Sequence, residues 1–274
     1  MMPDCLKASP VTLISLFCLL LLGLSPPPSW SARETRADLA TGSAPERAAV
    51  RTESRMDLTP DEAEWLKAHP VIRVGGETNW APYEFVDDLG RYQGVVRDYL
   101  DELERLLGVR FEVTSSAVWA DLMAGIRAGD IDLLPALYKT DEREQFLTFT
   151  RPYTRTNDFI FTRFDNTEIT DIDSLRGTRV AIVRDYAIQD VLQNPALGIH
   201  IVVVDSQHTA LKAVISGEAD AYVGDVNSVS YLIQTEGFGG LKLAGSSGLE
   251  KNGVHMAVRA ELAPLAGLID KAMA

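Results

Sequence analysis

The sequence DLLPALYKTDEREQFLTFTRPY, residues 132–153, contains the features that decide the fold. It begins as an apolar strand and passes through Thr140 into a helix start, so Arg143 comes directly after a buried-looking strand. A guanidinium held at such a point can fork onto a small carboxylate. The alternative is that Thr140 caps a short helix and that Glu142 and Arg143 are solvated charges of its first turn. The stretch by itself favours neither interpretation.

Strands and helices alternate upstream of this stretch. Val71–Val74, Phe111–Val113 and Ile131–Leu134 are typical of strands. Between them, apolar residues recur at helical spacing from Val95 to Leu107 and from Trp119 to Ile126. A chain of the form βαβαβ predicts a largely parallel sheet.

The alternation returns after residue 158 and predicts a second sheet. Two α/β units that meet at a cleft bring strand ends and helix starts around one cavity, which is where such folds bind small ligands. The expected strands are Phe159–Thr162, Val180–Val183, Ile201–Val204, Ala221–Val223 and a last one at Val254–Val258, with helices near 187–193, 207–217, 226–235 and from Leu262 onward.

The first residues are predicted to lie outside the fold. Lys7 precedes an apolar stretch, Val11–Leu24, which is followed by three prolines and the small-residue site Ser29-Trp30-Ser31. This pattern predicts a cleaved signal peptide over residues 1–31. A single membrane anchor is the competing interpretation, but the stretch is shorter than the roughly 20 residues that a span needs.

Composition narrows the remaining possibilities. Both cysteines, Cys5 and Cys18, lie in the leader, so the mature chain is expected to contain no disulfide. Residues 32–57 are polar and predict a flexible linker. Thr59 and Glu62 then form a capping-box pattern with Pro60 at the first helical position, which predicts a helix to about residue 68.

Charge and motifs exclude several classes of function. A formal net charge of -13 disfavours nucleic acid and anionic lipid as partners. The histidines show no metal-ligand spacing, and the sequence contains no phosphate-binding loop or hydrolase signature. We therefore predict no metal, no cofactor and no catalytic residue.

Five segments, two of them within residues 132–153, share one resemblance, which runs from about residue 70 to 272. In their order and spacing they resemble the bacterial extracellular solute-binding proteins of family 3, and in style the domains of this family that occur on membrane-bound sensors. The segments are Asn79-Trp80-Ala81-Pro82-Tyr83-Glu84-Phe85, Gly90-Arg91-Tyr92-Gln93-Gly94, Thr140-Asp141-Glu142-Arg143, Phe149-Thr150-Arg151-Pro152-Tyr153 and Gly217-Glu218-Ala219-Asp220-Ala221-Tyr222-Val223-Gly224-Asp225.

The resemblance implies an α/β fold of the type II periplasmic-binding-protein class, a two-lobed Venus flytrap with a cleft spanned by a hinge. The solute-binding domain would cover 58–274, with lobe 1 from about 58–157 and 250–274 and lobe 2 from about 159–246. In amino-acid-binding relatives, the position of Arg143 holds the ligand α-carboxylate and that of Asp225 holds the ammonium. Trp80 corresponds to an aromatic that covers the ligand side chain, and Glu77 to an acid that in some relatives meets a cation.

Each of these residues also has a purely structural interpretation. Asp225 could cap the helix that follows it, Trp80 could fill space beside Pro82, and Glu77 could be a solvated loop charge. Structural and ligand-binding roles stay open at this stage.

Departures from the family pattern make the ligand less certain. Where relatives have glycine followed by Ser or Thr, this chain has Asp185-Tyr186. The pattern found on sensor domains is closer to this chain. It fits at Arg184, Tyr186 and the alanine that follows, but Asp185 replaces its glycine. Tyr138 stands where amino-acid binders often carry serine. A ligand richer in positive charge, or one without an α-carboxylate, is therefore an option beside a standard amino acid. The candidate ligand-binding residues are Glu77, Trp80, Tyr138, Thr140, Arg143, Arg184, Asp185, Tyr186 and Asp225.

The expected function is binding of a small polar solute, an amino acid or related amine, in the periplasm by a domain that is monomeric in isolation. The partner would be an ABC permease or the chain's own downstream membrane, kinase or cyclase module. Relatives continue past the last expected helix, which leaves open whether the sequence is a fragment. The alternative is a periplasmic enzyme on the same fold, similar to cyclohexadienyl dehydratase, with Glu77 or Asp185 as its acid.

Overall fold

The computed structural model describes residues 56–248 and 252–274 of the chain. The predicted signal peptide and residues 32–55 of the predicted linker lie outside these ranges. Within the described ranges, no helix has both the length and the apolar composition needed to cross a bilayer. Met56 and Leu58 pack against the first hydrophobic core, so contact with the domain already begins inside the stretch predicted as linker.

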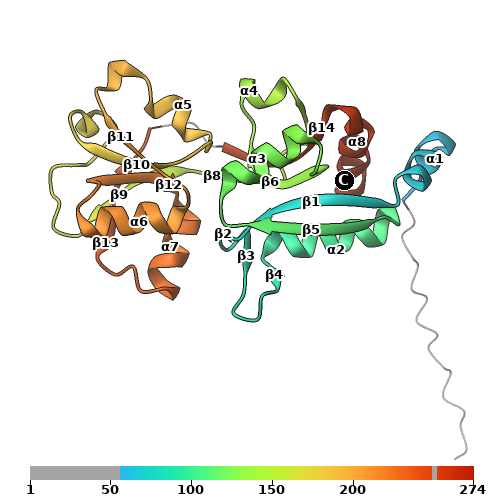
Figure 1. Ribbon diagram of the computed structural model, residues 1–274, viewed down its shortest axis with the longest axis horizontal. Coiled ribbons are helices and arrows are strands. Elements are labelled where there is room, and N and C mark those ends of the chain that lie inside the picture. The colour runs from blue at the N-terminus through green and yellow to red at the C-terminus, as the bar shows by residue number, and fades with distance from the viewer. Residues whose placement is uncertain (1–55, 249–251) are drawn as a thin grey trace, which may run out of the picture. The chain divides into compact units, whose positions relative to one another are not determined.

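A six-stranded sheet organises the first lobe (Figure 1). Its strands are β1 (Val71–Glu77), β5 (Arg110–Ser116), β6 (Leu133–Tyr138), β7 (Leu147–Phe149), β8 (Thr154–Thr156) and β14 (Asn252–Arg259). The order is β5-β1-β6-β14-β7, with β8 paired to β14 outside this path. β1 runs parallel to β5 and β6, as predicted from the βαβαβ pattern, whereas β14 is antiparallel to β6.

The helices of this lobe begin and end where local signals place them. The capping box at the first one forms: the Thr59 hydroxyl accepts from the Glu62 N–H at 3.3 Å, and the Glu62 carboxylate accepts from the Thr59 N–H at 2.7 Å. The second ends at Gly108, whose φ of 68° is left-handed. The helices are α1 (Pro60–Ala68), α2 (Val95–Leu107), α3 (Trp119–Ala128), the short α4 (Asp141–Glu144) and α8 (Ala263–Ala272), which follows a 3-10 turn η3 (Ala260–Leu262).

A second, five-stranded sheet organises the other lobe. Its elements are β9 (Asp158–Arg163), η1 (Asp173–Leu175), β10 (Arg179–Val183), α5 (Ile188–Leu192), η2 (Pro195–Leu197), β11 (His200–Val204), α6 (Gln207–Ser216), β12 (Ala221–Asp225), α7 (Val226–Thr235) and β13 (Leu241–Ser246). The strand order is β11-β10-β12-β9-β13. β10 is parallel to both of its neighbours, and β9 is antiparallel to both of its own.

A small antiparallel sheet adjoins the first one. It consists of β2 (Asn79–Trp80), β3 (Glu84–Val86) and β4 (Tyr92–Gln93), in that order. Trp80 and Tyr83 from this segment are buried in the first hydrophobic core. The small sheet thereby positions aromatic side chains next to the carboxyl end of β1.

The chain passes between the two large sheets twice. It leaves the first at β8 and enters the second at β9, and it returns from β13 to β14. Thr156 of β8 is paired with Asn252 of β14, so the two crossing segments adjoin each other. We call the part built on the first sheet and the small sheet lobe 1, and the part built on the five-stranded sheet lobe 2.

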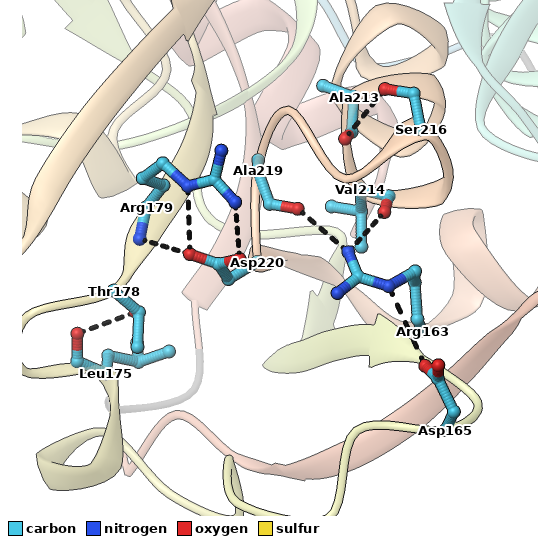
Figure 2. A network of polar contacts seen from close by, with 10 residues as sticks. All are labelled: Arg163, Asp165, Leu175, Thr178, Arg179, Ala213, Val214, Ser216, Ala219 and Asp220. Carbon is cyan, nitrogen blue, oxygen red and sulfur yellow. Dashed lines mark hydrogen bonds and ion pairs between the residues drawn. The ribbon is translucent and has the colours of Figure 1, made fainter.

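Matching Asp–Arg clamps fasten both sheets at the starts of their parallel strands. In lobe 2, the Asp220 carboxylate accepts from Arg179 Nε at 3.1 Å, Nη2 at 2.7 Å and the backbone N–H at 2.9 Å (Figure 2). In lobe 1, Asp132 accepts from the same three groups of Arg73 at 2.9, 2.6 and 3.0 Å. Asp132 precedes β6 and Arg73 lies near the start of β1, whereas Asp220 precedes β12 and Arg179 begins β10. The bonds therefore connect the starts of two paired strands in each sheet.

Some element boundaries differ from the predicted ones. The strand expected over Ile131–Leu134 begins at Leu133 and continues to Tyr138. Ile131 instead donates its N–H to the Gly125 carbonyl, and the Asp132 side chain binds Arg73. The sequence also did not predict β2–β4, β7, β8 and β13, because two or three residues show no readable period and β13 is interrupted by a bulge.

Candidate functional site

The candidate residues gather at the carboxyl ends of strands. Glu77 ends β1, Tyr138 ends β6, Asp225 ends β12, and Asp185 follows β10. In open α/β sheets this edge is where small ligands bind. The site therefore draws on both lobes.

One cavity lies where lobe 1 and lobe 2 residues meet. The space that the centre of a water molecule can occupy in it is about 30 Å³, which suits water rather than an amino acid, so a larger ligand requires the lobes to separate. Lobe 2 contributes Tyr186 and Ala187 to its lining. The other lining residues belong to lobe 1 and are Glu77, Trp80, Trp119, Ala136, Leu137, Tyr138 and Arg143.

Glu77 is a buried acid, with 2% of its surface exposed. Its Oε1 accepts a hydrogen bond from the Tyr186 hydroxyl of lobe 2. Burial raises the pKa of Glu77 to about 7, although the Tyr186 bond and the charge of Arg143 act in the opposite direction. The interpretation of Glu77 as a solvated loop charge is wrong.

Trp80 combines the two roles considered for it. It is buried in the core of lobe 1, with ring centroids 4.8 Å from Tyr83 and 5.7 Å from Tyr138, and it also lines the cavity. The Tyr138 hydroxyl is buried without a hydrogen-bond partner among the described residues. Trp80 therefore offers an aromatic face, and Tyr138 a free hydroxyl.

Arg143 fits neither simple interpretation of its stretch. Thr140 caps α4 by accepting from the Arg143 N–H at 3.2 Å, as the structural alternative predicts. The side chain, however, is buried, and the prediction of a solvated arginine is wrong. Nη1 donates to the Tyr138 carbonyl at 2.6 Å and Nη2 to the Asp185 carbonyl of lobe 2 at 2.7 Å.

Asp225 divides its two oxygens between two environments. Oδ1 accepts from the Ser228 N–H at 2.7 Å and caps α7, as the structural alternative predicts. Oδ2 is buried and has no hydrogen-bond partner among the described residues. Burial raises the pKa of Asp225 to about 7, opposed by the Ser228 bond and reinforced by Asp158. Capping leaves one carboxylate oxygen for another partner.

Two predicted residues point away from the cavity. The Arg184 side chain is exposed, with Nε 3.6 Å from Oδ1 of Asp205. The Asp185 side chain is also exposed, and its φ of 61° is the left-handed conformation that glycine adopts most readily. Only the backbone of Asp185 takes part in the site.

Sequence reasoning missed several contributors to the contact between the lobes. Trp119 Nε1 donates to the Asp185 carbonyl at 3.0 Å, and Asn227 Nδ2 donates to the Tyr83 hydroxyl at 2.9 Å. Trp119 was assigned to the apolar face of its helix, and nothing local marks its indole N–H. Tyr83 lies within the segment Asn79–Phe85, and its hydroxyl group was the feature of this segment that could have indicated a polar contact.

Comparisons with known proteins identify the family and the fold of the chain. A model of the bacterial extracellular solute-binding proteins, family 3, matches residues 72–274. The chain is 31% identical over 212 residues to the virulence sensor protein BvgS of Bordetella pertussis, covering 77% of this chain and 17% of that protein. The crystal structure of the BvgS periplasmic VFT2 domain is 30% identical, with a TM-score of 0.72, and 80% of this chain covers 93% of it.

A binding protein is also among the relatives. The probable amino-acid-binding protein YxeM of Bacillus subtilis is 28% identical, with 64% of this chain and 66% of that protein covered. The predicted two-lobed periplasmic-binding-protein fold is confirmed by the structural match. The matched proteins are binding and sensor proteins of a family that acts outside the cytoplasm.

Proposed function

The chain belongs to the bacterial extracellular solute-binding proteins of family 3, and we propose that its site binds a small polar solute carrying a cationic amino group, an amino acid or a related amine. Binding takes place between the two lobes and outside the cytoplasm, after export by the predicted signal peptide. Glu77, Trp80 and Asp225 receive the cation, and Tyr138 and Tyr186 complete its surroundings. The solute-binding domain spans residues 58–274, divided between the lobes as the resemblance implies.

One observation carries this proposal: two buried carboxyl groups lie at strand ends without an ion-pair partner among the described residues, Glu77 at the end of β1 in lobe 1 and Asp225 at the end of β12 in lobe 2. Among the described residues, neither Glu77 nor Asp225 forms an ion pair, and Oδ2 of Asp225 has no partner. Keeping a buried acid unpaired is unfavourable, so such groups mark sites that a ligand completes. An ammonium group supplies both the charge and the hydrogen-bond donors that these oxygens lack, and the Trp80 face favours a cation as well.

Ligand screening of the purified chain by thermal unfolding tests the proposal. A solute present at about 100 times its Kd stabilises the folded state by about 2.7 kcal/mol, which corresponds to a rise in Tm of about 5–10 °C for a domain of this size. The panel contains amino acids, monoamines and diamines, with sugars and dicarboxylates as negative controls. Stabilisation by anionic solutes alone would contradict the proposal.

Asp225→Asn is the variant that tests the assigned residue. The amide keeps an oxygen for the helix cap but removes the charge, so ligand affinity should fall about 10- to 100-fold. Asp165→Asn, on a side chain that is 84% exposed, is the matched control and should not change the affinity. An unchanged affinity in Asp225→Asn would remove this residue from the site.

For the output, we propose that the domain is the input module of a membrane sensor, with a downstream membrane, kinase or cyclase module as its partner. The support is the match to BvgS, both in sequence and as an isolated periplasmic domain. The chain spans only 17% of that sensor, so this assignment is a separate step. Uptake through an ABC permease is the alternative. Co-purification from membranes of the native host tests both, since a permease would be recovered only in the second case.

We further propose that the site binds its solute without converting it. Among the described residues that line the cavity, Glu77, with a pKa of about 7, is the one acid that could protonate a substrate. Incubation with prephenate, followed by detection of released product, tests this directly. Turnover that is lost in Glu77→Gln would replace binding by a dehydratase-like activity.

A further inference from the structure

Tyr186 of lobe 2 reaches across to lobe 1. Its hydroxyl donates to Oε1 of Glu77, the last residue of β1. Its ring also lies edge-on to the Trp119 ring of lobe 1, with the two centroids 6.1 Å apart. Glu77 and its hydrogen-bond donor therefore belong to parts of the chain that move apart when the lobes separate.

The closed arrangement of the lobes buries the Glu77 carboxyl group. Only 2% of the surface of Glu77 is exposed, and the small cavity that it lines is bounded from lobe 2 by Tyr186 and Ala187. Separation of the lobes takes these two residues away from Glu77 and admits water to it. Burial favours the neutral form of a carboxyl group and water favours the charged form. The closed and open arrangements therefore hold the proton of Glu77 with different strength.

Two neighbours favour the charged form of Glu77 without outweighing its burial. Arg143 lines the same cavity and donates to the backbone carbonyls of Tyr138 and Asp185. Its charge and the Tyr186 bond both lower the pKa of Glu77, but burial raises it more, to about 7. The tyrosines of the cavity, Tyr138 and Tyr186, have pKa values well above the ordinary one and stay neutral.

A second buried acid, Glu84, does not depend on the position of lobe 2. It is fully buried inside lobe 1, where its Oε2 accepts from the Tyr92 hydroxyl of β4. The charge of Glu77 acts on it and raises its pKa, as it also does for Tyr222 of β12. Tyr92 lies in the same lobe as Glu84, so separation of the lobes leaves their bond intact. Of the two neighbouring acids, Glu77 is the one whose surroundings change.

We propose that the two lobes close with uptake of one proton at Glu77, so that acidification favours the closed arrangement even without a solute. The inference concerns the lobes themselves and does not depend on the solute proposed above. In the closed arrangement the pKa of Glu77 is about 7, and in the open one the solvated carboxyl group returns toward its ordinary value of 4.5. The ratio of closed to open molecules should therefore rise about tenfold per pH unit as the pH falls from about 7 to about 5.

Distances between two spin labels measure the closed fraction in the purified chain without added solute. The labels are attached at Asp98→Cys in α2 and Lys212→Cys in α6, two exposed positions in different lobes, after Cys5 and Cys18 are replaced by serine. The population with the closed distance, relative to all other distances, should fall at least about tenfold between about pH 5.5 and about pH 8. A ratio that stays constant or rises with pH overturns the inference.

Glu77→Gln tests the assigned acid in the same measurement. Glutamine keeps an oxygen that accepts from Tyr186 and carries no charge, so this variant should retain the closed distance at both pH values. Glu64→Gln, on an exposed side chain of α1, is the matched control and should respond to pH like the unmodified chain. A pH response that persists in Glu77→Gln would assign the proton to another group and overturn the inference. Failure of every solute in the thermal screen would bear on the proposed function alone.

Discussion

Asp132 and Asp220, at the starts of β6 and β12, each receive three hydrogen bonds from one arginine. By contrast, Glu77 and Asp225, at the ends of β1 and β12, form no ion pair with any residue that the structure describes. The pKa values follow this difference. Burial by itself raises the pKa of Asp132, but the bonds from Arg73 outweigh it and the net shift is downward. Burial raises the pKa of Glu77 to about 7 against the Tyr186 bond and the charge of Arg143, and it raises the pKa of Asp225 to about 7 as well.

We propose that this difference separates acids that stabilise the fold from acids that a ligand completes. A carboxylate with three donors is satisfied within the chain and strengthens the sheet. A buried carboxylate without a cation lowers the stability of the folded chain, and its retention at the edge where α/β sheets bind ligands points to function. The same strand, β12, carries one acid of each kind at its two ends.

Breaking the clamp in lobe 1 should have the largest effect on stability. Asp132→Ala leaves Arg73 and Arg259 without the carboxylate that both contact, at 2.6 and 2.8 Å, and should lower the free energy of unfolding by about 3 kcal/mol. Urea denaturation measures the change. Asp130→Ala, on an exposed side chain two residues away, is the matched control. A loss below about 1 kcal/mol, the range of a surface pair, would show that the clamp is not a structural acid.

The pH dependence of stability should have opposite signs for the two unpaired acids, Glu77 and Asp225, and for the two acids bound by arginine, Asp132 and Asp220. The folded pKa values of Glu77 and Asp225, about 7, lie above their ordinary values of 4.5 and 3.8. At pH values between these limits, the folded chain therefore binds more protons than the unfolded chain. Their contribution to stability therefore increases as the pH falls from about 7 toward 4, by up to a few kcal/mol. Asp132 and Asp220, whose pKa values are lowered, stabilise the fold above about pH 4 and lose this contribution below it.

Glu77→Gln isolates one of these groups. Urea denaturation between pH 5 and 8 should show a shallower fall in stability with rising pH than in the unmodified chain, because the glutamine does not titrate. Glu64→Gln, on an exposed side chain of α1, should leave the slope unchanged. An identical slope in Glu77→Gln would mean that Glu77 is not the unpaired buried acid described above.

Breaking the clamp in lobe 2 should have the smallest effect. The Asp220 side chain is 25% exposed, against 8% for Asp132, and it binds one arginine rather than two. Asp220→Ala should therefore lower the free energy of unfolding by about 1–2 kcal/mol. Glu218→Ala, on an exposed neighbour, serves as its control. An effect equal to that of Asp132→Ala would show that burial does not set the strength of the clamp.

The sequence predicted the parts of this fold that depend on neighbours along the chain. The capping box of Thr59 and Glu62 and the helix that ends at Gly108 formed where expected, and Asp225 caps α7 as its structural interpretation predicted. Each of these features involves residues within about four positions or an apolar period of one helix. The strands at the lobe boundary were missed, since their two or three residues acquire their conformation from pairing with distant strands.

The candidate site shows where local reasoning stops. Of the residues that it assigned to the ligand site, Glu77, Trp80 and Arg143 line one cavity, whereas Asp225 ends β12 and is not among the lining residues of that cavity. It did not predict that the Arg184 and Asp185 side chains are exposed, or that the Asp185 backbone receives Arg143 and Trp119. Backbone groups are identical at every position, so nothing in the residue types marks which carbonyl will accept such a bond.

The sequence by itself determined the two-lobed α/β architecture, the helix caps and the set of acids and aromatics at the strand ends, because periodicity, capping and motif order are local properties. Only the tertiary structure decided which acids are paired. Asp132 meets Arg73 from 59 residues away, Arg143 meets Asp185 from 42, and Tyr186 meets Glu77 from 109. Whether a carboxylate stabilises the fold or awaits a cation depends on such distant partners and on burial, and these exist only once the chain has folded.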